Sequence, residues 1–344
     1  MSTFIGLPSG GGEILVSNTI YVDVVNGDNA TAAKGNMAKP FATITGAGGA
    51  NSVALLNDLV HVRPGVYPEN DITIDGVAYY FDKGAIIHPS EALQNTDGKA
   101  IIHISAYVNK ACILGYGEFI SDYNIGGATG ISCIYVSTDE AHLEFYMAHM
   151  TASNSNGGVR ATVKASHTGG LDQEVYIKGI IKKDNSNGGV AQTAFYVLSG
   201  NVRFEGRIIQ NSTGSAAHGL YVASDTADFK GTGDIYCDGD TAGSYAFRIN
   251  SRGKTLWYGN IVAGNQATCY AYYTDSNYTG ESAIYGQFLG AVGLSLGGFN
   301  QRGSYISGIQ HCYASPNGYA IQCNDASHNV VDLVIASSIS IFNV

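Results

Sequence analysis

The pentapeptide Val175-Tyr-Ile-Lys-Gly179 decides the fold, because its pattern returns 27 residues later as Val202-Arg-Phe-Glu-Gly206. The pattern is a small or apolar residue, any residue, a large apolar residue, any residue and glycine. Further copies are Ala111–Gly115, Ala227–Gly231, Thr255–Gly259, Ser282–Gly286 and Ser304–Gly308, with Leu143–Met147 as a copy without the glycine. From residue 179 on, successive glycines lie 27, 25, 28, 27 and 22 residues apart, so we expect a repeat of about 27 residues.

The third position of this repeat holds a large apolar residue in every copy. Its occupants are Ile113, Phe145, Ile177, Phe204, Phe229, Trp257, Ile284 and Ile306. The fourth position is mostly polar or amphipathic, which is the alternation of a strand with one buried face. A second strand-like segment precedes each copy. These features predict a parallel β-helix in which like residues stack on successive coils; the alternative, a β-propeller, needs about 40–45 residues per blade.

The composition agrees with a chain of strands and turns. It has 45 glycines and 23 tyrosines against 6 prolines and 4 methionines. The 45% of hydrophobic and 13% of charged residues argue against intrinsic disorder, and a net charge of −10 argues against nucleic-acid binding. We therefore expect an all-β protein.

Several classes of site and location are also disfavoured. No run of about 18 apolar residues is present, so we expect no membrane insertion. Gly10, Gly11 and Gly12 stand where a signal peptide needs an apolar region, so we expect no secretion by that route. The six cysteines stand singly and the nine histidines lack metal-ligand spacing. We expect buried thiols, no metal and no cofactor.

The two ends of the chain differ from the repeats. The run Ala47–Asn57 predicts a short helix that caps the first coil, as terminal repeats require. An uncovered apolar strand at Val330–Phe342 would aggregate, so we expect another subunit to cover it. The expected divisions are an attachment segment at 1–18, the β-helix start and cap at 19–90, the coils at 91–329, and a C-terminal strand at 330–344.

A series of short stretches near the N-terminus is more specific: Tyr21–Asp23, Asn26–Thr31, Lys39–Ile44, Val60–Glu69 and Gly84–Ile87. Together they resemble the start of right-handed parallel β-helix proteins of the pectate-lyase-like superfamily, most closely the versions in bacteriophage tailspikes and other virion appendages. The resemblance implies a right-handed coil, and the crossover rule predicts the same hand. It also implies a homotrimer that binds or cleaves cell-surface glycans. The departure is at residues 47–57, which are glycine-rich where the family has an amphipathic helix.

A catalytic site is not evident. The densest acidic group is Asp234, Asp238 and Asp240, and a glycosidase needs two carboxylates about 5–10 Å apart. We expect these residues to form a solvated turn, and the lyase and galacturonase signatures of the family are absent. The prediction is that no residue is catalytic; if the protein is an enzyme, these three acids are the candidates. Lys178, Glu205 and Lys230 are expected to form a charge ladder.

Tyrosines are the candidates for ligand contact. Tyr258 and Tyr285 fall on one outward row, and the further candidates for glycan or receptor binding are Tyr272, Tyr273 and Tyr305. Phenol rings stack on sugar rings while their hydroxyls stay hydrated. Tyrosine also fills grooves between subunits, so both interpretations remain open.

The expected function is a virion appendage of the tailspike or tail-fibre type, assembled in the host cytoplasm. We expect a homotrimer that contacts other virion proteins through residues 1–18 and binds a host surface polysaccharide. A polysaccharide-degrading hydrolase or lyase is the main alternative, and a bacterial β-helix adhesin or scaffold is the third. The expected lack of a signal peptide argues against the adhesin.

Overall fold

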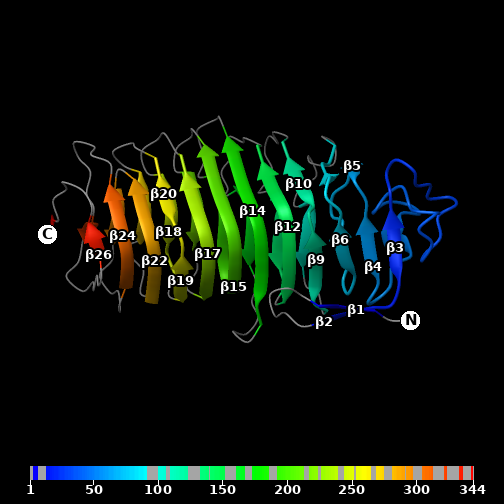
Figure 1. Cartoon of the computed structure of the whole chain (residues 1–344), viewed down its shortest axis with the longest axis horizontal. Helices are drawn as coiled ribbons and strands as arrows, with labels where there is room; N and C mark the ends of the chain where they lie inside the picture. The colour runs from blue at the N-terminus through cyan, green and yellow to red at the C-terminus, as the bar shows by residue number, and fades with distance from the viewer. Residues whose placement is uncertain are drawn as a thin grey trace.

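The structure is a computed structural model, in which strands lie side by side along one long axis (Figure 1). It describes the backbone of residues 3–6, 13–90, 100–105, 109–122, 132–138, 140, 141–151, 160–166, 173–185, 192–212, 217–223, 226–238, 244–251, 253–264, 269–274, 281–290, 292–296, 304–312, 321–323, 333–335 and 342–343. Within these residues, no helix is long and apolar enough to cross a membrane.

The N-terminal third contains short strands and one 3-10 turn. These elements are β1 (Thr3–Gly6), β2 (Glu13–Val16), β3 (Thr19–Val22), η1 (Ala50–Ser52), β4 (Leu59–Val62), β5 (Gly65–Tyr67), β6 (Ala78–Phe81), β7 (Ala85–Ile87), β8 (Ile102–Ser105), β9 (Ala111–Gly115) and β10 (Glu118–Ser121).

The middle and the C-terminal third contain the longer strands. They are β11 (Ile134–Ser137), β12 (Ala141–Met150), β13 (Arg160–Ser166), β14 (Val175–Asn185), β15 (Gln192–Ser212), β16 (Ala217–Val222), β17 (Ala227–Cys237), β18 (Tyr245–Ile249), β19 (Lys254–Tyr258), β20 (Ile261–Ala263), β21 (Tyr270–Thr274), β22 (Glu281–Gly290), β23 (Val292–Leu296), β24 (Ser304–Cys312), β25 (Ile321–Cys323), β26 (Leu333–Ile335) and β27 (Phe342–Asn343).

The strands from β3 onward pair in parallel. In the longest one, β15, residues 202–210 pair with β14 on one side and β17 on the other. The earlier part of β15, residues 192–197, pairs instead with β13 and β16. The chain therefore passes from one parallel ladder into a second, and each ladder is extended by strands from distant parts of the sequence. The expected all-β chain with a long parallel sheet is confirmed, and the arrangement is consistent with a β-helix-like solenoid.

A continuous core runs between the ladders. Phe204 and Trp257 are fully buried, and their rings stack with centroids 6.3 Å apart. The ring of Phe229 also stacks on Trp257, at 6.2 Å. Aromatic stacking is therefore present in the core, with both phenylalanine rings against Trp257, but the three residues do not occupy one position on successive strands as the repeat predicts.

The register of this stack differs from the expected alignment. Phe204 pairs with Gly231, and Phe229 pairs with Val202. The shift is two residues, which leaves every side chain on the same face. A Cβ atom on Gly231 would lie 2.3 Å from the Trp257 ring, so the absent side chain makes room for the indole.

The corner glycine of this copy also changes. Gly206 pairs with Gly179 and with Gly233, so the corner is Gly233 instead of Gly231. In the copy without a glycine, Leu143 pairs with both Ile113 and Ile177, which corrects the expected position of Phe145. A register shift between Glu144 and Met147 accounts for the missing corner.

The N-terminal region is only partly as predicted. Strands form at Thr19–Val22 and Leu59–Val62, but the expected capping helix over residues 47–57 is wrong. Only Ala50–Ser52 forms a 3-10 turn, because Gly48 and Gly49 directly before it disfavour a helix. The Glu69 carboxylate accepts hydrogen bonds from the backbone N–H groups of Ile44 and Thr45, just before this segment.

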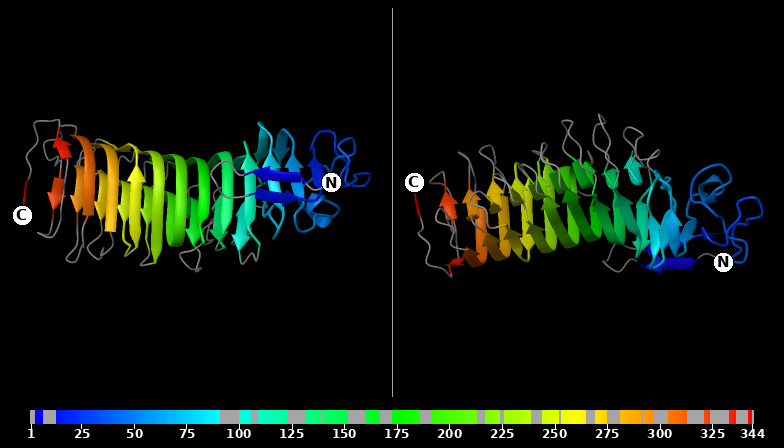
Figure 2. Two further views of the ribbon diagram at one scale, coloured as in Figure 1. Left: turned by 60° about the horizontal axis from the view of Figure 1, so that its bottom comes forward. Right: turned by 90° about the horizontal axis from the view of Figure 1, so that it is seen from above.

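The two termini lie at opposite ends of the long axis. Strands β1 and β2 pair antiparallel and run along the long axis, across the direction of the parallel strands (Figure 2). At the other end, the predicted single strand over 330–344 is two short strands: β26 pairs with β24, and β27 pairs with β25. Both ladders therefore continue to the C-terminus.

Candidate functional site

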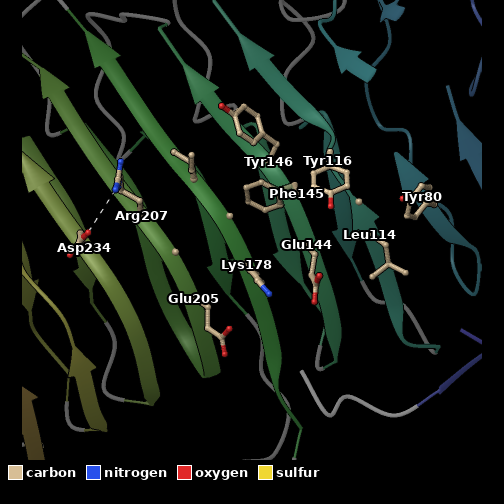
Figure 3. A pocket seen from close by; sticks show the side chains of 14 residues that line it. Tyr80, Leu114, Tyr116, Glu144, Phe145, Tyr146, Lys178, Glu205, Arg207 and Asp234 are labelled. Carbon is tan, nitrogen blue, oxygen red and sulfur yellow. Dashed lines mark ion pairs between the residues drawn. The ribbon is translucent and has the colours of Figure 1, made fainter. Parts of the chain in front are cut away.

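A surface groove of about 930 Å³ lies across the parallel strands β6, β9, β12, β14, β15 and β17 (Figure 3). We call it the tyrosine groove. Its lining residues are Tyr80, Leu114, Gly115, Tyr116, Glu144, Phe145, Tyr146, Lys178, Gly179, Ile180, Glu205, Gly206, Arg207 and Asp234.

The corner glycines form the floor of the tyrosine groove. Gly179 and Gly206 have φ angles of +155° and +144°, and each lies inside a continuous strand, β14 or β15. A Cβ atom on Gly206 would lie 2.1 Å from the carbonyl oxygen of Gly179. Residues just before and just after each glycine therefore line the groove around an exposed backbone floor.

The residues before the glycines form one row. Tyr80 pairs with Leu114. From β12 onward the paired residues are Glu144, Lys178, Glu205, Thr232, Tyr258 and Tyr285, in that order. The predicted candidates Tyr258 and Tyr285 therefore continue the wall of the tyrosine groove, with their rings stacked at 4.8 Å and an interplanar angle of 9°.

Exposed aromatic surface is concentrated here. Among the described residues, the tyrosines with the most exposed side chains are Tyr116, Tyr146 and Tyr258, at 58%, 48% and 46%. Tyr116 and Tyr146 line the groove itself (Figure 3), and Tyr258 lies on its extended wall. An exposed phenol face is a suitable platform for the apolar face of a sugar.

Each carboxylate in the groove already has a protein partner. Glu144 lies 2.9 Å from Nε2 of His142, and Glu205 accepts a hydrogen bond of 2.6 Å from Arg203. Asp234 accepts a hydrogen bond of 2.9 Å from Asn260. The same carboxylate faces Arg207 at 3.9 Å, the ion pair drawn in Figure 3.

The pKa of Glu205 argues against acid catalysis. Burial disfavours the charged form, but hydrogen bonds from Tyr176 and Arg203 outweigh it, so the pKa lies below its ordinary value. A general acid needs a pKa raised toward the working pH. Glu205 is therefore poorly suited to protonate a leaving group.

The two predicted acids that the structure describes, Asp234 and Asp238, line different hollows. Asp234 lies in the groove wall, whereas Asp238 follows the end of β17 and lines a neighbouring hollow of about 380 Å³. Asp240 is outside the described residues. The Asp238 side chain is exposed, which agrees with a solvated turn.

The other predicted tyrosines have different environments. Tyr272 is fully buried in the core, so its ring is not accessible to a ligand. Tyr273 is half-buried on the second ladder, with its ring 4.6 Å from that of Tyr245. The backbone of Tyr305 pairs with Ala283 in β22, and its side chain is outside the described residues.

The predicted charge ladder forms only in part. Lys178 pairs with Glu205 as expected, but Glu205 then pairs with Thr232. Lys230 pairs with Arg203, because the register in β17 is shifted by two residues. The ion pair to Glu205 comes instead from Arg203 on the same strand.

Sequence reasoning missed Tyr80, Tyr116 and Tyr146. Tyr116 directly follows the corner Gly115. Its position next to a corner glycine is the sequence signal that could have identified it as a residue of the groove wall. The register shift in β12 moves Tyr146 out of the position that the repeat assigns to it, so the repeat did not identify it as a groove residue. Within the described part of the chain, no group of three histidine, cysteine, aspartate or glutamate residues is arranged to hold a metal ion.

Comparisons with known proteins do not assign this site. No protein-family model, no curated protein and no solved structure matches the chain.

Proposed function

We propose that this protein is a virion appendage that binds a host surface polysaccharide in the tyrosine groove. The observation that carries the binding function is the exposure of Tyr116 and Tyr146 in a groove with a backbone floor. The resemblance of residues 20–90 to tailspike β-helices supports the placement in a virion. The proposal includes a right-handed β-helix with coils of about 27 residues.

A polysaccharide-degrading enzyme is the second candidate. It requires a carboxylate that can act as a general acid, and the hydrogen bond from Arg203 makes Glu205 unsuitable. Asp234 is likewise held by Asn260 and faces Arg207. These contacts favour binding without cleavage.

The subunit arrangement is part of the proposal. We infer a homotrimer that uses residues 1–18 to contact other virion proteins. Light scattering should give three times the chain mass of 36.1 kDa. A monomer would refute this assembly without affecting the groove.

A binding assay tests the proposed function. Purified protein is applied to an array of bacterial capsular polysaccharides and lipopolysaccharides, together with the variants Tyr116→Ala and Tyr146→Ala. Loss of a stacked ring is expected to weaken binding about tenfold. The control Tyr135→Ala removes a half-buried tyrosine of the second ladder and should bind normally.

The same samples distinguish the alternatives. New reducing ends or unsaturated uronate absorbance that disappear in Glu205→Gln or Asp234→Asn would establish an enzyme. Equal binding by the wild type and both groove variants would refute the tyrosine groove as the site. Genes for other virion proteins beside this one would support the appendage, and genes for cell-surface export would favour an adhesin.

A further inference from the structure

We propose that the ligand of the tyrosine groove is an acidic polysaccharide, whose negative groups pair with Lys178 and Arg207 while its sugar rings contact tyrosines on both sides. This inference rests on the proposed function and adds the chemical class and the direction of the ligand. It depends on which charges of the groove remain available.

The carboxylates are the less available charges. The side chains of Glu144, Glu205 and Asp234 are 16%, 26% and 28% exposed. Each of these carboxylates lies within 2.9 Å of a hydrogen-bond donor or an imidazole. In each case that group belongs to a residue that does not line the groove. A cationic ligand would have to compete with these contacts.

The cations are the more available charges. Lys178 is exposed and forms no hydrogen bond or ion pair with another residue that the structure describes. The side chain of Arg207 is 52% exposed, and its ion pair with Asp234 is long, at 3.9 Å. Its guanidinium lies over the Tyr236 ring, 5.7 Å from the centroid, which orients the group.

The local charge balance permits an anion. The lining residues carry three carboxylates and two cations, Lys178 and Arg207, and Arg203 outside the lining pairs with Glu205 and brings the site to neutrality in a chain of net charge −10. An acidic polymer is repelled by the chain as a whole, but not by this groove. Lys178 and Arg207 come from opposite sides of the glycine floor, on adjacent strands β14 and β15 (Figure 3).

The arrangement of aromatic rings gives the ligand its direction. Tyr116 and Tyr146 lie on the N-terminal side of the two cations, and Tyr258 and Tyr285 lie on the C-terminal side. From β12 to β19 there are four interstrand steps, or about 19 Å at about 4.8 Å each. The geometry therefore fits an internal stretch of a chain that lies along the long axis, across the strands.

The test uses purified bacterial polysaccharides, acidic and neutral, together with carboxyl-reduced forms of the acidic members. Reduction converts a uronate into a neutral hexose without changing the linkage. We expect binding to an acidic member that falls at least tenfold after reduction, in Lys178→Gln and in Arg207→Gln. Lys230→Gln, an exposed lysine of β17 outside the groove, is the matched control.

Chain length supplies a second readout. Fragments of the bound polysaccharide should gain affinity until they span about 19 Å, and the last gain should be absent in Tyr258→Ala. Affinity that is already maximal for a disaccharide would overturn the extended orientation.

The outcomes separate this inference from the proposed function. Binding to a neutral polysaccharide, or acidic binding unchanged by carboxyl reduction, would overturn the acidic ligand and leave the glycan-binding function standing. Binding to no polysaccharide would overturn both.

Discussion

Replacing Gly206 with alanine tests the physical basis of the fold and of the groove floor. Gly206 has a φ angle of +144°, in a region that almost only glycine adopts, where an L-residue is strained by about 1–3 kcal/mol. Its Cβ atom would lie 2.1 Å from the Gly179 carbonyl oxygen, a backbone atom that a rotamer change does not move. Overpacking of this kind costs about 1–3 kcal/mol. We expect Gly206→Ala to lower the free energy of unfolding by about 2–6 kcal/mol.

A second glycine separates the two contributions. Gly35 has a φ angle of +79°, and a Cβ atom on it would meet no atom within 4 Å. Gly35→Ala should therefore cost only the backbone contribution, about 1–2 kcal/mol. Because the backbone strain at Gly206 is at most about 3 kcal/mol, the part of the loss in Gly206→Ala that exceeds this value is assigned to the steric overlap between neighbouring corner glycines.

The assay is urea unfolding at fixed protein concentration, followed by tryptophan fluorescence and by circular dichroism. Trp257 is the single tryptophan and is fully buried, so its emission reports on the core next to the glycine row. Fixed concentration is needed because oligomerisation shifts the midpoint. If Gly206→Ala unfolds within about 0.5 kcal/mol of the wild type, or if Gly35→Ala is equally destabilised, the stacked-glycine argument is wrong.

Three further predictions concern the core. Burial, and to a smaller extent the nearby Arg248, lowers the pKa of His218 from 6.5 to about 3. Between these two pH values the unfolded state therefore binds more protons than the folded state, and the free energy of unfolding falls as the pH falls. Between pH 6.5 and 5, the wild type should lose about 2 kcal/mol more than His218→Gln in urea unfolding, and equal losses would contradict the assignment. Burial raises the pKa of the Cys133 thiol to about 12. Peptide mass spectrometry should therefore find Cys133 unalkylated after iodoacetamide treatment of the native protein and alkylated after treatment in urea. Alkylation of the native protein would show that the core around Cys133 opens. Phe204→Ala should cost about 3–5 kcal/mol with a red shift of Trp257 emission, and an unshifted spectrum would show that the two rings do not pack together.

Much of the strand arrangement could be predicted from local pattern. Val175 pairs with Val202 and Tyr258 pairs with Tyr285, as the repeat indicates. Alternation of apolar and polar residues identifies the buried face, and a glycine marks the corner in the regular copies, because these features depend on neighbouring residues alone.

The register at the irregular copies could not be predicted in this way. Placing Phe229 opposite Val202 or opposite Phe204 buries the same face, so the alternation does not distinguish the two registers. The choice depends on whether the Trp257 indole has space, and that space comes from Gly231. Side-chain packing among three strands decides it.

The candidate site likewise combines features that the local sequence predicts with features that depend on tertiary packing. By itself, the sequence determined an all-β chain with parallel strands, glycine corners and an outward pair of tyrosines at 258 and 285. Only the tertiary structure placed Tyr116, Tyr146 and Arg207 in one groove, from β12, β15 and the segment after β9. Residues 30 or more positions apart become neighbours because parallel strands stack about 4.8 Å apart, and their register is set by long-range packing that no local pattern contains.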